Sequence, residues 1–184
     1  MTDSEVDTWT GEVLDFWFAL STEQQFAKDE ALDAEIRERF GTLHARVAAT
    51  GAAGWRDDPR TLLAAIIVLD QFSRNLFRGQ AEAFANDALA QELTRLALDR
   101  GWDARLSPEQ RVFLYMPMMH AEDAEGQAVS VRLFEALGIE ENARFARDHA
   151  AVIDRFGRFP SRNAALGREN SAQEREYLAA GGGW

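Results

Sequence analysis

Two short arginine-containing segments carry the residue types best suited to binding an anion. Residues 73–79 read SRNLFRG and residues 161–168 read SRNAALGR, so each has Ser-Arg-Asn, then apolar residues, then an arginine beside a glycine. The guanidinium group presents a planar fork of donors that matches a carboxylate or phosphate, and glycine lets the backbone approach a ligand closely. We expect a site for a small anion or an acidic peptide terminus, formed by Arg74, Asn75, Arg78, Arg158, Arg162, Asn163 and Arg168.

The sequence HAED at residues 120–123 places acid–base side chains directly after the apolar run VFLYMPMM. If the helix continues past Pro117, His120 and Asp123 face inward and Glu122 points elsewhere. If the helix breaks at the proline, all three side chains could point into one cavity. An imidazole beside carboxylates suits general acid–base chemistry, so His120 is the candidate catalytic residue. The alternative is a hydrogen-bonded network in the core. A second histidine at ligand spacing and an HExxH pattern are both missing, so we predict no metal site and assign no cofactor.

Asp70 is a carboxylate on an apolar helix face, because it follows Ile66 and Ile67 by four and three residues. A buried carboxylate is costly unless it is paired, and Arg74 stands one helical turn later. We therefore predict a structural ion pair between Asp70 and Arg74. The other arginines could also be structural, since arginines at helix ends bind free carbonyl groups and can pair with acids.

Composition excludes several classes of protein. The formal net charge of −11 over 184 residues argues against nucleic-acid binding. The absence of cysteine excludes disulfides, thiol catalysis and cysteine-bound zinc. No apolar run approaches the roughly 18 residues of a membrane span, and the polar residues 1–8 do not resemble a signal peptide. We expect a cytoplasmic protein with no membrane contact.

The elements that must position these residues all read as helices. Apolar residues recur at steps of three and four throughout, and capping signals such as DDPR at 57–60 and SPEQ at 107–110 mark helix starts. Pro117 predicts a kink or break in its helix, and residues 73–80 read as a loop. About eight helices are expected, at about residues 9–19, 30–50, 59–72, 81–100, 108–119, 124–137, 140–156 and 171–178.

An all-α fold of antiparallel helix hairpins follows, and we expect one domain over residues 1–184 with flexible ends at 1–8 and 181–184. The periodicity leaves open whether the hairpins stack as in a solenoid or form an irregular bundle.

Three long motifs resemble those of a bacterial family catalogued as domain of unknown function 924. They are WRDDPRTLLAAIIVLDQFSRNLFRG, FLYMPMMHAEDAEGQ and RFGRFPSRNAALGRENSAQE. The resemblance covers nearly the whole chain and implies a tetratricopeptide-like all-α fold, without implying a reaction. The chain departs from the family pattern at Ser73 (usually proline), Ala121 (usually serine) and Ser161 (usually histidine). The missing histidine at 161 argues against a scheme that needs an imidazole in that loop.

The function that these residues favour is a binding module in which the arginines hold a small anion or peptide terminus, with Asp70, His120, Glu122 and Asp123 close to them. One alternative is a hydrolase or lyase that acts on a phosphorylated or carboxylated substrate, with His120 as the acid–base. Another is an interaction scaffold in which every motif is structural. The sequence alone does not decide whether the protein is an enzyme.

Overall fold

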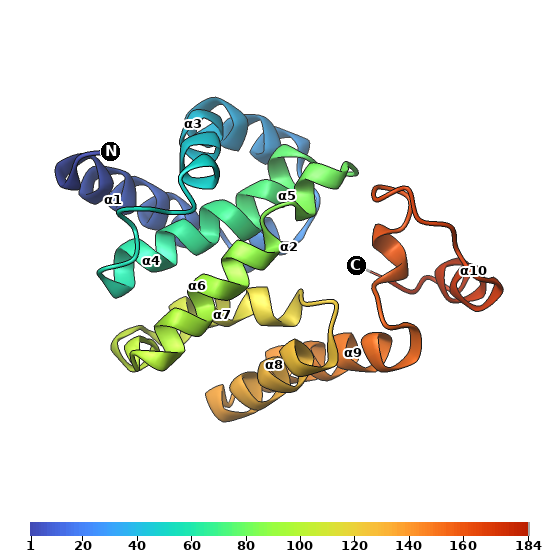
Figure 1. Cartoon of the computed structure of the whole chain (residues 1–184). Coiled ribbons are helices and arrows are strands. Elements are labelled where there is room, and N and C mark those ends of the chain that lie inside the picture. Colours follow the sequence, from blue (N-terminus) through green and yellow to red (C-terminus); the bar gives the residue numbers. More distant parts are fainter. Residues whose placement is uncertain (184) are drawn as a thin grey trace.

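The computed structural model describes residues 1–183, and every regular element among them is a helix (Figure 1). The α-helices are α1 (Asp3–Ala19), α2 (Thr22–Phe26), α3 (Glu30–Ala49), α4 (Pro59–Ile66), α5 (Ser73–Leu76), α6 (Asp87–Asp99), α7 (Pro108–Met119), α8 (Ala124–Leu137), α9 (Glu140–Phe156) and α10 (Ala172–Ala179). A π-helix, η1 (Ile67–Phe72), joins α4 to α5, and the 3₁₀ turns are η2 (Ala81–Phe84), η3 (Trp102–Arg105) and η4 (Pro160–Arg162). The predicted all-α fold is confirmed. The expected helices each overlap one of the longer helices, and α2 and α5 are short additions.

Capping side chains begin the helices where the sequence places them. Asp58 accepts hydrogen bonds from the backbone N–H groups of Arg60 and Thr61, and Pro59 occupies the first position of α4. Ser107 and Gln110 form a reciprocal capping box at the start of α7. Each such cap stabilises its helix by about 1 kcal/mol, so local sequence fixes these boundaries.

Two local predictions were wrong, and one of two alternatives at Pro117 is excluded. The first helix begins at Asp3 rather than Trp9, because Thr2 and Glu5 form a further capping box. Residues 73–76 are helical rather than part of a loop, because α4, η1 and α5 follow one another directly and form one continuous helix. The break allowed for at Pro117 does not occur, since α7 continues to Met119 and the chain turns at His120. Trp184, at the end of the tail expected to be flexible, lies outside the described residues.

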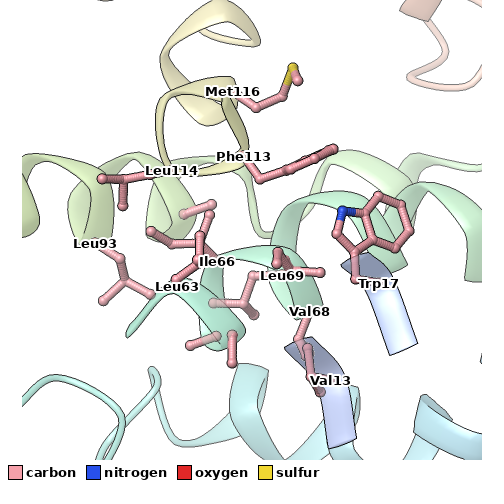
Figure 2. Close-up of a cluster of buried hydrophobic side chains, with 14 of the residues drawn as sticks. Val13, Trp17, Leu63, Ile66, Val68, Leu69, Leu93, Phe113, Leu114 and Met116 are labelled. Atoms are coloured by element: carbon pink, nitrogen blue, oxygen red, sulfur yellow. The ribbon is translucent and has the colours of Figure 1, made fainter. Parts of the chain in front are cut away.

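The long central helix formed by α4 and η1 is the core of the fold. It packs against α1 on one side and against α6 and α7 on the other, while η1 also packs on α3. Figure 2 shows side chains of Leu63, Ile66 and Leu69 between those of α1 and those of α6 and α7. All three are fully buried, as expected for a helix that packs against neighbours on more than one side.

The remaining helices extend the core as successive neighbours. The pair α7 and α8 and the pair α8 and α9 are in contact, and Gly138 adopts a left-handed conformation (φ 78°) where α8 ends. Figure 1 places α10 beyond the end of α9, at the opposite end of the molecule from α1. A small second cluster of Val152, Ile153 and Phe159 buries the C-terminal segment. The tetratricopeptide-like stacking stays a prediction. Within residues 1–183, none of the helices combines the length and apolar character that crossing a membrane requires.

Replacing Leu63 by alanine should lower the free energy of unfolding by about 2–5 kcal/mol, because it empties a fully buried position in the central helix. The same substitution at Leu89, a partly buried residue packed on the edge of the core, should cost less. Urea denaturation followed by circular dichroism measures both. Equal losses at the two sites would contradict the central role of α4.

Candidate functional site

The π-helical turn η1 places one carboxylate inside the core. Asp70 lies in this turn and is only 1% exposed. A π-turn widens the helix by one residue and therefore shifts the face that later side chains occupy, a feature common at functional sites. Asp70 leaves the apolar face of Ile66 and Ile67 in this way and reaches polar partners from three directions.

Those partners keep Asp70 ionised despite its burial. His120 Nδ1 lies 2.8 Å from Asp70 Oδ1, Arg74 Nη1 lies 3.0 Å from the same oxygen, and the Gln71 amide donates to Oδ2. Burial by itself would raise the pKa of Asp70, but the charge of Arg74 and the contacts with His120 and Gln71 outweigh it and hold the pKa well below its usual range. The carboxylate is therefore a hydrogen-bond acceptor only.

This fixes the tautomer of His120, the residue that ends α7. Because Asp70 only accepts, His120 Nδ1 must carry the proton and Nε2 must carry the lone pair in the neutral ring. Burial and the nearby charge of Arg74 lower the pKa of His120, which favours the neutral ring. The side chain is 15% exposed, and none of residues 1–183 hydrogen-bonds with Nε2. A basic nitrogen is thus left facing outward.

Asp87, a residue that the sequence analysis missed, joins the two arginine segments. Arg74 binds it in bidentate fashion, with 3.1 Å from Nη1 to Oδ1 and 3.1 Å from Nη2 to Oδ2. Arg162 donates from Nη1 to Asp87 Oδ2 at 3.0 Å. Asp87 shares the buried face of α6 with Ala90, Leu93, Thr94 and Ala97. Counting back from Leu93 by three residues to Ala90 and by three more would have identified it.

Two aromatic rings and two hydrogen bonds hold the guanidinium of Arg162. It lies 4.7 Å from the ring centroid of Phe84 and 4.7 Å from that of Phe159, and its Nη2 donates to the His120 carbonyl oxygen at 3.0 Å. Cation–π contacts of this kind stabilise a desolvated arginine. Arg162 therefore connects the C-terminal segment with both α6 and the end of α7.

A surface cleft of about 410 Å³ opens beside His120. Its walls come from η2 and α6, from the turn between α7 and α8, and from the segment around Arg162 and Leu166. Of the residues predicted to form a site, four line this cleft, together with Asp87 and the ring of Phe84: His120, Glu122, Asp123 and Arg162. The structure thus brings together the HAED motif and the second arginine segment, with Arg74 directly behind Asp87.

Three of the predicted residues, Asn75, Arg78 and Arg158, lie outside the cleft lining and bind acids that also lie outside it. Arg78 binds both oxygens of Asp33, and Asn75 donates to the same carboxylate at 2.8 Å. Arg158 binds both oxygens of Glu174. These contacts tie neighbouring segments of the chain to one another.

Glu122 connects the cleft rim with the C-terminal segment. Arg168 binds it in bidentate fashion at 2.8 and 2.9 Å, and the backbone N–H of Phe159 donates to it at 2.7 Å. Arg168 also donates from Nε to the side-chain oxygen of Asn163. Asp123 caps α8 by accepting from the Gly126 N–H at 2.7 Å. Nowhere in residues 1–183 do three histidines or acids gather in a way that could hold a metal ion.

His149 lies behind His120, with 6.4 Å between the ring centroids. Its Nδ1 donates to the Phe145 carbonyl oxygen at 2.8 Å, and its ring contacts Phe159 edge-on. Burial is the main cause that lowers the pKa of His149 to about 3. The ring therefore stays neutral at physiological pH, as expected of a histidine on an apolar helix face.

Comparisons with known proteins agree with this architecture. A family model described as a bacterial protein of unknown function (DUF924) matches residues 13–182. A solved structure of a protein of unknown function from Agrobacterium tumefaciens is 37% identical, with a TM-score of 0.90 over 95% of this chain and 99% of that one. No curated protein in the comparison matches the chain. Neither description names an activity, so the chemistry rests on the geometry of the site.

Replacing His149 by glutamine should reduce the dependence of stability on pH. The unfolded chain binds a proton on this histidine below about pH 6.5, whereas the folded protein does so only near its pKa of about 3. Stability is therefore lost as the pH falls below about 6.5. Melting temperatures measured from about pH 7 to pH 5 should fall less steeply in the variant. An unchanged slope would contradict burial of a neutral ring.

Replacing Glu122 by glutamine should loosen the C-terminal segment, because it removes the charge that pairs with Arg168 and leaves one acceptor oxygen where two served Arg168 and the Phe159 N–H. Amide hydrogen exchange over residues 158–168 should speed up. Glu125→Gln, at an exposed position in the first turn of α8, is the matched control. Equal protection in both variants would show that other contacts hold the segment.

Proposed function

This chain belongs to the DUF924 family of bacterial proteins of unknown function, and we propose that its cleft is an active site in which His120 acts as the general base. One observation carries the proposal: an imidazole whose Nδ1 is held by a buried carboxylate lines a cleft, and its Nε2 has no hydrogen-bond partner among residues 1–183. A histidine held in one tautomer by a carboxylate is the arrangement that general-base catalysis uses.

The proposed chemistry moves one proton. His120 Nε2 accepts a proton from a bound water or substrate group, and the Asp70 carboxylate stabilises the imidazolium that forms. In a hydrolase the activated water attacks the substrate, and His120 then returns the proton to the leaving group. In a lyase the proton comes from a carbon next to a carbonyl or carboxylate group. The electrons of that C–H bond form a carbon–carbon double bond as the substituent on the neighbouring carbon leaves, and His120 passes the proton to that leaving group.

The substrate class that we propose is a small phosphorylated or carboxylated metabolite. Arg162 lines the cleft and uses Nη1 and Nη2 within the protein, so some of its five N–H donors remain for a substrate oxygen. The apolar part of the cleft wall, which includes Phe84 and Leu166, suits the carbon skeleton.

Binding of an anion without chemistry is the second candidate, and the presence of Arg162 in the cleft favours it. It is the weaker one because all five predicted arginines already pair with carboxylates of this chain, so an anion would have to compete with them. A scaffold that docks a partner would be expected to expose an apolar groove. Met1 and Phe26 are the exposed large hydrophobic residues in the described part of the chain.

Replacing His120 by glutamine should abolish turnover. Purified protein is incubated with a fractionated metabolite extract, and mass spectrometry follows compounds that are consumed. We expect consumption by the wild type and a loss of about 10²–10⁴-fold in the variant, the usual contribution of a general base. Asp33→Asn, which disturbs a similar ion pair outside the cleft lining, should retain activity.

Thermal melting of each variant shows whether it remains folded. Full activity in a folded His120→Gln variant would contradict the proposal. If phosphorylated or carboxylated compounds bind, shift the melting temperature and are never consumed, the binding module is the better description.

A further inference from the structure

Asp87 links two arginines that both touch the proposed catalytic pair. Arg74 comes from α5 and Arg162 from η4, 75 residues after Asp87 along the chain. Asp87 is 8% exposed, so the three charges meet in a largely dry place. Such a group is costly unless the charges balance and the hydrogen bonds are satisfied.

Each arginine then reaches one member of the pair. Arg74 Nη1 lies 3.0 Å from Asp70 Oδ1 and donates to the Asp70 carbonyl oxygen at 2.8 Å. Arg162 Nη2 donates to the His120 carbonyl oxygen at 3.0 Å. Asp87 is therefore one residue removed from both Asp70 and His120.

Two donor groups lie beside one oxygen of Asp70. His120 Nδ1 hydrogen-bonds with Oδ1 at 2.8 Å, and Arg74 Nη1 lies 3.0 Å from the same oxygen as an ion pair. The hydrogen bonds of Arg74 Nη1 go instead to the Asp70 carbonyl oxygen and to Asp87 Oδ1. Asp87 thus holds an N–H group of Arg74 that could otherwise turn to Asp70 Oδ1. The two acids and the two arginines sum to zero charge, and neutralising Asp87 would leave one positive charge beside His120.

We propose that Asp87 is a positioning residue, which keeps Arg74 from displacing His120 at Asp70 and so keeps Nε2 aimed at the cleft. This inference rests on the proposed function of His120. The inference goes beyond that function because it assigns a role to Asp87, an acid that contacts neither His120 nor Asp70. The charged and titratable groups that face His120 are Asp70, Arg74, Asp87, Arg162 and His149.

The experiment is nuclear magnetic resonance of ¹⁵N-labelled histidine, which reports the tautomer and titration of each ring without a substrate. In the wild type we expect His120 to be neutral near pH 7 with the proton on Nδ1. In Asp87→Asn we expect the proton to shift partly to Nε2 and the titration midpoint of His120 to move to lower pH, because Arg74 takes Asp70 and an uncompensated positive charge remains.

Asp33→Asn is the matched control. Asp33 is also a largely buried carboxylate that holds two donors, Arg78 and Asn75, but its pairing partners do not touch His120. A role of Asp87 in stability alone predicts that both variants lower the melting temperature and that neither moves the His120 signals. Unchanged His120 signals in a folded Asp87→Asn variant would overturn the inference.

A second variant covers the case in which Asp87→Asn does not fold. Asp87→Glu keeps the charge but moves it by one methylene, so it should shift the His120 signals in the same direction by a smaller amount. No shift in this variant would also overturn the inference. With a substrate from the metabolite experiment, Asp87→Asn should lower kcat by about 10–100-fold, as when the outer partner of a functional imidazole is lost.

The two proposals fail in different ways. A wild-type His120 that carries its proton on Nε2 would overturn the role of His120 as a base with Nε2 at the cleft. A wild-type spectrum as expected, with no change on substitution of Asp87, would overturn only the positioning role.

Discussion

The buried carboxylate of Asp70 is the constraint on which the rest of the site depends. A charge in the core costs several kcal/mol unless other groups compensate it, and the π-helical turn that follows α4 places it there. Its partners must therefore come to it. Arg74 arrives from the next turn of the same helix, whereas His120 arrives from the end of α7, fifty residues later. Satisfying one acid thus fixes where two helices end relative to each other.

The same requirement accounts for arginine-rich segments in an acidic protein. The C-terminal segment has only a small apolar cluster of its own, so ion pairs supply much of its attachment. Arg162 reaches Asp87, and Arg168 reaches Glu122. Paired in this way, the arginines serve the fold first. The chemistry that we propose belongs to the place where pairing is incomplete, which is Nε2 of His120, a residue that lines the cleft.

A polar atom without a hydrogen-bond partner, such as Nε2 of His120, is unfavourable unless neighbouring groups stabilise the form of the ring that carries it. A neutral imidazole with one open nitrogen is stable here because burial disfavours its protonated form, and because Asp70 removes the other tautomer. The site is therefore prepared before any ligand arrives, since no side chain has to reorganise for Nε2 to accept a proton.

The sequence by itself determined most of the fold and part of the site. Capping residues and apolar periodicity act locally, so they located the main helices, and the apolar surroundings of Asp70 indicated a buried charge. Only tertiary structure decided which arginine pairs with which acid, because those partners are up to 75 residues apart along the chain. It also revealed Asp87, a polar residue on the buried face of α6. Tertiary structure also decided the tautomer of His120, because the tautomer depends on which group the folded chain brings to Nδ1.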